Sequence, residues 1–286
     1  MNIWPAPAKL NLFLRVTGRR ADGYHTLQTV FQFLDYGDEL EFIVTGDGPI
    51  TRATPLRGVA EEKDLSVRAA RLLKSRAAVT RGAQIHVTKR IPPGGGLGGG
   101  SSDAATTLLA LNELWDLRLT LPDLAALGLE LGADVPVFIH GHAAWAEGIG
   151  EILTPVEPEE AWYLVVVPPV HVSTARVFAD PELTRYSPPL TIRDFHEGHG
   201  LRNDLEPLVR SRYPEVDRAM RLLAEFGEPR MSGSGGCVFL EVTDMERGRQ
   251  ILERIPKPLS GFVARGMNRH PLLFGRGEGS HRDVAG

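Results

Sequence analysis

The chain has 286 residues, a length that suits one large domain or two of ordinary size. Its hydrophobic fraction of 42% and charged fraction of 24% are typical of a globular protein with a sizeable core. The net charge of −4 excludes a generally basic surface, so we expect neither a nucleic-acid nor a membrane partner.

The single cysteine, Cys237, excludes an intrachain disulfide and fits a reducing compartment. Near the N-terminus, Pro5 and Pro7 interrupt a segment that also carries Lys9 and Asn11. We therefore expect no signal peptide or transmembrane segment, and a cytoplasmic protein. Nothing in the sequence determines the oligomeric state.

Periodicity and turn residues predict the elements of the first half in chain order. These are strands at residues 10–16, 26–34 and 38–45, a helix at 64–74, a strand at 83–89, and helices at 102–115 and 122–131. We expect Asp22-Gly23 to form the tip of the turn between the first two strands, and Ser102 or Asp103 to cap the helix that follows a glycine-rich run.

The second half is predicted in the same way. The expected elements are strands at residues 162–167, 237–242 and 261–265, and helices at 174–178, 213–226 and 245–255, with a loop-rich stretch at 187–201. Strands and helices mix without strict alternation, which favours an α+β fold. Pro155 and Pro158 mark the expected boundary between domains at residues 1–155 and 156–275, followed by a polar tail at 276–286 without fixed structure.

The most informative segment is a glycine-rich run that leads directly into a predicted helix. Glycine permits backbone angles forbidden to other residues, and the free amides of a helix N-terminus attract phosphate. We therefore predict a phosphate-binding loop, whose residues are Pro92, Pro93, Gly94, Gly95, Gly96, Leu97, Gly98, Gly99, Gly100, Ser101 and Ser102.

Three alternatives compete for this loop. The match to G-x-G-x-x-G at Gly94, Gly96 and Gly99 is weak, since no second strand ending in an acidic residue follows. A P-loop would need a G-K-[ST] sequence, and the lysine is missing here. A flexible linker would not lead into an apolar helix.

The loop itself carries no cation, but two charged residues elsewhere lie among apolar neighbours. Lys9 lies at the start of a predicted strand, where a lysine usually points to water. Asp134 lies between Gly132 and Pro136, where it could equally cap a helix. A second glycine cluster, residues 232–236, precedes the strand at 237–242 and is either a plain turn or a second backbone contact for a ligand.

Taken together, these segments resemble the GHMP kinases, named for galactokinase, homoserine kinase, mevalonate kinase and phosphomevalonate kinase. The family's three motifs match residues 7–12, 93–102 and 232–236 in order. Finer matches resemble members that act on a cytidine-diphosphate-linked methylerythritol, and they cover residues 20–29, 132–138, 141–144, 147–151 and 203–206.

The resemblance implies a two-domain fold, ribosomal-protein-S5-like at the N-terminus and ferredoxin-like at the C-terminus, with the active site between the domains. It implies transfer of the ATP γ-phosphate to the 2-hydroxyl of that substrate, with ATP held by residues 92–102 and Mg²⁺ as cofactor. The metal ligands stay open, and His140, His142, His196 and His199 lack the partners of a structural zinc site.

For individual residues, the resemblance implies that Asp134 is the base for the acceptor hydroxyl and that Lys9 lies beside it and holds it ionised. It places Asn11, Tyr24, His25, Thr174 and Phe178 at the substrate, with Tyr24 stacked on cytosine and His25 bonded to its edge. One departure is Asp64, where the family usually has asparagine near the adenosine.

Two other functions stay open at this stage. A GHMP kinase for a smaller alcohol, of the homoserine or mevalonate type, would not need an aromatic pair such as Tyr24-His25. A non-catalytic ATP-binding sensor on the same fold would not need Lys9 and Asp134.

Overall fold

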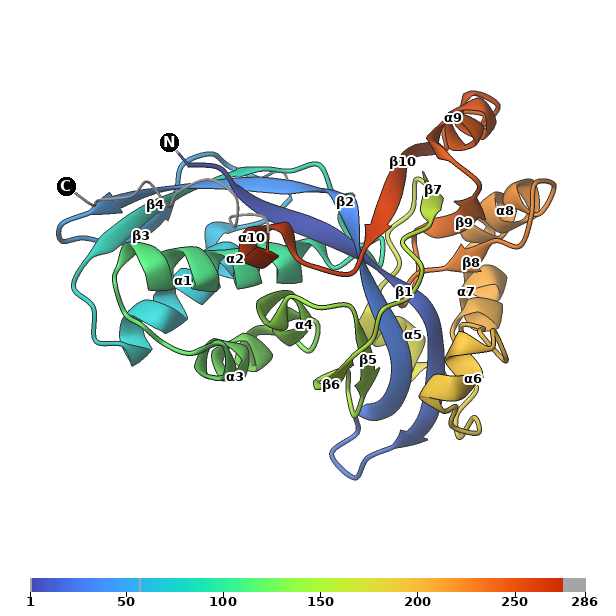
Figure 1. Cartoon of the computed structure of the whole chain (residues 1–286), viewed down its shortest axis with the longest axis horizontal. Helices are drawn as coiled ribbons and strands as arrows, with labels where there is room; N and C mark the ends of the chain where they lie inside the picture. Colours follow the sequence, from blue (N-terminus) through green and yellow to red (C-terminus); the bar gives the residue numbers. More distant parts are fainter. Residues whose placement is uncertain (1, 57, 275–286) are drawn as a thin grey trace, which may run out of the picture.

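The computed structural model describes residues 2–56 and 58–274. The polar tail expected at residues 276–286 lies outside this range. Two long antiparallel strands, β1 (Trp4–Arg19) and β2 (His25–Thr45), run through the centre of the molecule (Figure 1). Their connecting turn fits the prediction at Asp22-Gly23, because Asp22 Oδ1 accepts a hydrogen bond from the Tyr24 amide at 3.1 Å and Gly23 has a φ of +92°.

The sequence predicted two separate strands at 26–34 and 38–45, and this was wrong. Strand β2 continues through both segments: its pairing with β1 shifts register between Phe33 and Gly37 and resumes where Gly37 pairs with Pro7. A side chain at Gly37 would place its Cβ 2.4 Å from the Ala6 carbonyl oxygen, so only glycine permits this close approach.

The sheet is mixed in direction, and its main path runs β3-β4-β2-β10-β7-β9-β8. Strand β3 pairs parallel with β4, and the other pairs are antiparallel. The remaining strands are β3 (Ile50–Arg52), β4 (Gly82–Thr88), β5 (Ala144–Glu147), β6 (Ile152–Pro155), β7 (Trp162–Val167), β8 (Arg230–Met231), β9 (Val238–Val242) and β10 (Ser260–Met267).

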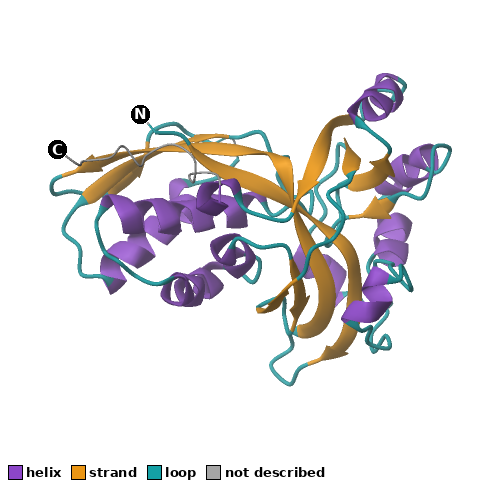
Figure 2. Ribbon diagram, in the orientation of Figure 1, coloured by secondary structure: helices purple, strands orange, loops and turns teal. Residues whose placement is uncertain are grey.

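Helices cover the sheet in two groups (Figure 2). The group on one side of β1, β2 and β4 encloses a large apolar core and consists of α1 (Leu65–Arg76), α2 (Gly99–Leu114), α3 (Leu121–Leu131) and α4 (Val135–His140), with the short η1 (Glu61–Lys63) before them. The later helices are α5 (Thr174–Ala179), α6 (Ile192–His196), α7 (Glu206–Arg212), α8 (Pro214–Leu223), α9 (Met245–Glu253) and α10 (Pro271–Phe274).

The start of α2 corrects the predicted cap. The helix begins at Gly99, with Gly98 as its N-cap in the left-handed conformation, and no side chain caps it. Ser102 and Asp103 instead lie inside the helix and are buried. The left-handed angle of Gly98 turns the chain into the helix without a polar side chain, which leaves the first amides free.

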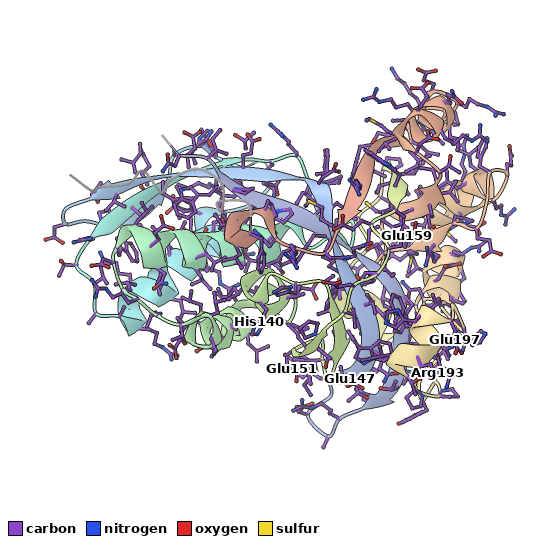
Figure 3. The ribbon with its side chains drawn as sticks, in the orientation of Figure 1. His140, Glu147, Glu151, Glu159, Arg193 and Glu197 are labelled. Atoms are coloured by element: carbon purple, nitrogen blue, oxygen red, sulfur yellow. The ribbon has the colours of Figure 1, made fainter. Side chains whose placement is uncertain are left out.

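The stretch expected to be loop-rich, residues 187–201, contains the short helix α6. A capping box between Thr191 and Asp194 starts this helix, and an ion pair between Arg193 and Glu197 at 2.8 Å lies on its exposed face (Figure 3). The prediction also missed β3, β5, β6, β8, η1, α4, α7 and α10, which are all of seven residues or fewer. Within residues 2–56 and 58–274, no helix has both the length and the apolar character to span a bilayer.

The mixed α+β fold class is confirmed. The division between residues 1–155 and 156–275 stays a prediction. Strand β10 returns from the second half and pairs with β2 at Gly266–Leu34, while its other end pairs with β7. A continuous sheet therefore joins the two halves and holds the loops between them in place.

Candidate active site

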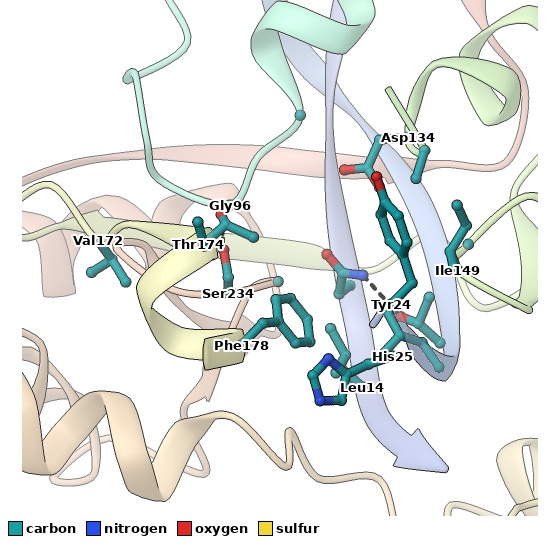
Figure 4. Close-up of a pocket in the computed structure, with 18 of the residues that line it drawn as sticks. Leu14, Tyr24, His25, Gly96, Asp134, Ile149, Val172, Thr174, Phe178 and Ser234 are labelled. Atoms are coloured by element: carbon teal, nitrogen blue, oxygen red, sulfur yellow. Dashed lines mark hydrogen bonds between the residues drawn. The ribbon is translucent and has the colours of Figure 1, made fainter. Parts of the chain in front are cut away.

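A cavity of about 800 Å³ lies where β1, β2, the glycine loop (residues 92–102), the start of α4 and the start of α5 meet (Figure 4). In the figure, Asp134, Tyr24 and Ile149 lie along one side, and Val172, Thr174, Phe178 and Ser234 lie along the other. The predicted site residues that line this cavity are Lys9, Asn11, Tyr24, His25, Gly94, Gly96, Gly98, Asp134, Thr174 and Phe178.

The glycine loop is held firmly by strands on both sides. The Leu97 carbonyl accepts from the Lys9 amide at 3.0 Å, and the Gly95 carbonyl accepts from the Cys237 amide at 3.0 Å. The Gly96 carbonyl accepts from Ser232 Oγ at 2.9 Å. These bonds exclude the linker alternative, and they show that the second glycine cluster contacts the first.

Close packing explains why glycine is required at one position in particular. Gly96 has a φ of +74°, and a Cβ there would lie 2.2 Å from the Ser232 carbonyl oxygen. Just beyond it, the first amides of α2 have no partner within the helix, and their partial positive charge faces the end of the loop. The backbone therefore provides an anion site without a cation in the loop itself.

The loop residues divide by position. Gly94, Gly96 and Gly98 line the main cavity, whereas Pro92, Pro93 and Gly95 line a smaller neighbouring hollow of about 300 Å³. Five members of the predicted set, Leu97, Gly99, Gly100, Ser101 and Ser102, do not line the main cavity. The Ser102 hydroxyl is fully buried and has no hydrogen-bond partner among the described residues.

A buried ion cluster anchors the start of the loop. Lys89 Nζ contacts Asp103 Oδ2 at 2.6 Å and also bonds to Asp38 Oδ2, while Asp38 Oδ1 accepts from the Ile91 amide at 2.8 Å. Burial raises the pKa of the Asp103 carboxyl to about 7, against the opposing effect of the Lys89 ammonium. The cluster ties β2, β4 and α2 together immediately before residues 92–102.

Lys9 and Asp134 meet on the wall of the cavity. Lys9 is 2% exposed, so the expectation that a lysine here points to water was wrong. Its Nζ lies 3.2 Å from Asp134 Oδ2 and 5.0 Å from the centre of the Phe31 ring. Asp134 precedes α4, but its side chain makes no capping bond, so its carboxylate is free for the pair and for a ligand.

Asn11 supports this pair from the strand below it. Its Oδ1 accepts from Lys9 Nζ, and its Nδ2 donates to Thr29 Oγ1 at 3.0 Å. Lys9 and Asn11 are two residues apart on β1, so their side chains point to the same face of the strand. Asn11 therefore orients the ammonium group while also lining the cavity.

Aromatic side chains form the far end of the cavity. The rings of His25 and Phe178 stack with centroids 5.3 Å apart and planes at 29°, and Tyr24 beside them is 62% exposed. Thr174 Oγ1 lies 2.6 Å from Ser234 Oγ, which connects α5 to the second glycine cluster. An exposed tyrosine next to stacked rings offers a flat, apolar seat to a planar ligand.

Asp64 has a structural role in the described contacts. Its Oδ1 caps α1 by accepting from the Ser66 amide at 2.9 Å, and its Oδ2 pairs with Arg52 at 2.9 Å. Sequence reasoning missed other contributors, among them Arg185, which donates to the His25 ring at 3.0 Å. No periodicity or motif in its polar segment distinguishes Arg185 from an exposed loop residue.

Taken together, the geometry defines a class of protein. An anion site of backbone amides lies at one end of a cavity, a lysine–carboxylate pair lies on its wall, and an aromatic seat lies at the other end. These are the parts that phosphoryl transfer to a small-molecule hydroxyl requires, namely a phosphate cradle and a group that positions the nucleophile.

Comparison with known proteins agrees with this class. The model of the GHMP kinases N terminal domain matches residues 64–142, and that of the GHMP kinases C terminal matches residues 190–261. The chain is 55% identical over 269 residues to a 4-diphosphocytidyl-2-C-methyl-D-erythritol kinase of Thiobacillus denitrificans, covering 94% of this chain and 96% of that one. A kinase of the same name from Pseudomonas syringae pv. syringae is 55% identical over 266 residues, covering 93% and 94%. The chain belongs to the GHMP kinase family.

Solved structures support the same assignment of fold. A 4-(cytidine 5'-diphospho)-2C-methyl-D-erythritol kinase matches with a TM-score of 0.80 and 33% identity, covering 93% of this chain and 99% of that one. The mevalonate kinase of Methanococcus jannaschii matches with a TM-score of 0.69 and 18% identity, covering 93% and 98%. The second likeness concerns the fold alone.

Proposed function

We propose that this protein transfers the γ-phosphate of ATP to the 2-hydroxyl of 4-diphosphocytidyl-2-C-methyl-D-erythritol, giving the 2-phosphate and ADP. The observation that carries the proposal is identity of 55% across nearly the whole chain to kinases named for this substrate. The shape of the cavity supports it, because its aromatic end suits a nucleobase and its other end suits a phosphate donor.

ATP would place its phosphates on residues 92–102 and on the free amides of α2. The carbonyl groups of the loop are already held by β1 and by Ser232, so its backbone N–H groups need little ordering when phosphate binds. The lysine that a P-loop would provide in sequence comes here from Lys9 on β1, whose Cγ lies 3.0 Å from where a Cβ on Gly98 would be.

Asp134 would orient the acceptor hydroxyl and accept its proton, while Lys9 balances the charges of the carboxylate and of the transferring group. The hydroxyl oxygen forms a bond to the γ-phosphorus as the bond from that phosphorus to the β,γ-bridging oxygen breaks, and the bridging electrons leave with ADP. Since phosphoryl transfer depends chiefly on position and charge, the fixed pair on a rigid strand suits this step.

The described residues also fit a magnesium ion brought by ATP. Mg²⁺ prefers oxygen ligands and uses only one or two from the protein beside nucleotide phosphates and water. The buried Ser102 hydroxyl is such an oxygen, since it has no protein partner and lies in the first turns of α2. When bound there, the ion would neutralise phosphate charge.

A coupled ADP-release assay tests the proposal with three acceptors: the cytidylated methylerythritol, homoserine and mevalonate. We expect turnover only with the first, because the aromatic seat has nothing to hold in a small aliphatic alcohol. Turnover with mevalonate and none with the cytidylated compound would show that the acceptor is wrong while the kinase activity is right.

A further inference from the structure

The ring of His25 has one polar partner among the described side chains, the guanidinium of Arg185. Arg185 Nε lies 3.0 Å from His25 Nε2, at the edge of the imidazole ring. The Phe178 ring stacks on the face of the same imidazole. His25 itself is 7% exposed and lines the cavity beside Tyr24 (Figure 4). The orientation of the ring is therefore set by a residue that lies outside the cavity lining.

Arg185 is itself fixed, because all five of its N–H donors have acceptors. Besides His25, the guanidinium donates to four backbone carbonyl oxygens within residues 178–183, at 2.8 to 3.4 Å; these belong to Phe178, Asp180, Pro181 and Leu183. Because the guanidinium group is planar and all of its N–H donors are bonded, its orientation is fixed. A lysine could not make this set of bonds.

This contact determines the tautomer of His25. A guanidinium only donates and stays charged, so the ring nitrogen facing it must accept. A neutral imidazole with an accepting Nε2 carries its proton on Nδ1. The one ring atom left for a ligand is then a hydrogen-bond donor.

We infer that Arg185 is a positioning residue that holds His25 as a permanent Nδ1–H donor, and that this donor makes the site select cytosine over uracil. The inference rests on the proposed function, since it concerns the base of the proposed substrate. On the pairing edge, N3 of cytosine bears a lone pair and accepts, whereas N3 of uracil bears a hydrogen and would face the donor. A free histidine could exchange tautomers and serve either base, but one held by Arg185 cannot.

The chain offers a matched control in Arg212. This arginine binds the same loop, with Nε 3.2 Å from Asp180 Oδ2 and Nη2 2.7 Å from Glu182 Oε2, and among the described residues it does not hydrogen-bond to His25. If Arg185 acted only by ordering residues 178–183, Arg212→Met would have the same kind of effect as Arg185→Met. If it acts through the ring, only Arg185→Met changes the choice of base.

The experiment measures kcat and KM for the cytidylated methylerythritol and its uridylated counterpart in the wild type, Arg185→Met, Arg185→Lys and Arg212→Met. We expect Arg185→Met and Arg185→Lys to raise KM for the cytidylated compound about 2–10-fold with little change in kcat, the loss typical of one hydrogen bond between neutral groups. The preference for cytidine over uridine should narrow by a similar factor. Arg212→Met should keep the wild-type preference.

Nitrogen NMR of histidine-labelled protein provides a readout that needs no turnover. The His25 signal, assigned by comparison with His25→Gln, should show a protonated Nδ1 and a bare Nε2 in the wild type, and a mixture of tautomers in Arg185→Met. An unchanged tautomer or an unchanged base preference in folded Arg185→Met would overturn the inference. If the wild type phosphorylated neither compound, the proposed substrate would be wrong, and so would the base selection inferred from it. The NMR result would still decide whether Arg185 fixes the tautomer of His25.

Discussion

The pair formed by Lys9 and Asp134 leads to the sharpest test of how the site works. Lys9→Met removes the ammonium group but keeps an apolar stem of similar length in a position that is 2% exposed. The change leaves Asp134 without its cation at 3.2 Å and Asn11 Oδ1 without its donor. Folding should survive, because methionine fills irregular apolar space well.

The magnitude follows from the distance and the burial. Two unit charges 3.2 Å apart attract by about 5 kcal/mol at an effective dielectric constant of 20. The Asp134 side chain is 35% exposed, so solvent screens part of this attraction. Hydrogen bonds to charged groups typically contribute about 1.5–3 kcal/mol, and we take this range for the screened contact between Lys9 and Asp134. Lys9→Met should therefore lower kcat/KM about 10–150-fold.

The assay is a double-mutant cycle on kcat/KM in the coupled ADP-release reaction. Asp134→Asn alone should lower kcat about 10²–10⁴-fold while a non-hydrolysable ATP analogue still binds, because the glycine loop is untouched. If the two residues act as one unit, the double variant should resemble the worse single variant. Lys63→Met, at an exposed position on η1, should match the wild type.

Additive effects would refute this reasoning. If the two losses summed to within about 0.5 kcal/mol, the residues would act independently and the short contact would have no catalytic meaning. Full activity in Asp134→Asn would refute the role of the carboxylate altogether.

Three further predictions concern the loop, the core and the aromatic seat. Gly96→Ala should weaken binding of the ATP analogue at least about tenfold by calorimetry, because its Cβ meets a carbonyl oxygen at 2.2 Å; Gly198→Ala, with the same φ of +74° and open space around it, controls for backbone strain alone. Burial lowers the pKa of His270 to about 3, whereas the same side chain in the unfolded chain binds a proton near pH 6.5. As the pH falls below 6.5, protonation therefore favours the unfolded chain, and the free energy of unfolding should drop by about 2 kcal/mol by pH 5. His270→Gln should flatten that decline in urea unfolding. Tyr24→Ala should raise KM for the cytidylated substrate about 10-fold and leave KM for ATP unchanged.

Each of these has an outcome that would contradict it. Equal binding by Gly96→Ala and Gly198→Ala would mean that the approach of Ser232 does not shape the loop. If His270→Gln lost as much unfolding free energy between pH 6.5 and pH 5 as the wild type does, other groups would cause that loss. His199→Gln, a substitution of an exposed histidine, is the control. A change in KM for ATP with Tyr24→Ala would mean that the aromatic seat and the phosphate site are not separate.

Much of the fold was open to prediction from local pattern. The strand at residues 162–167 is apolar throughout and buried at its four central residues, and β7 has those bounds. The helices at 122–131 and 245–255 carry clear start signals and were located within two residues of their observed ends. The break expected between 34 and 38 was wrong, since β2 continues through a register shift and pairs with β1 again from Gly37, a contact that no local pattern reveals.

The candidate site was predictable only in part. The glycine run has a local signal strong enough to indicate a phosphate loop. Lys9 and Asp134 stood out only as charged residues among apolar neighbours, and the family resemblance gave them their expected roles. Their separation of 125 positions hides a contact of 3.2 Å. Arg185 had no signal at all, because its importance depends on which ring lies beside it.

The sequence by itself determined where the chain can turn tightly, which segments are apolar enough to form a core, and that a glycine-rich segment would run into a helix. Those properties depend on neighbouring residues and their backbone preferences. Only the tertiary structure decided that Lys9 on β1 lies beside the glycine loop and that Ser232 contacts Gly96. It also decided that Asp134 leaves its helix uncapped and that Arg185 sets the ring of His25. These are contacts between distant segments, and they exist because one sheet brings both halves of the chain to the same cavity.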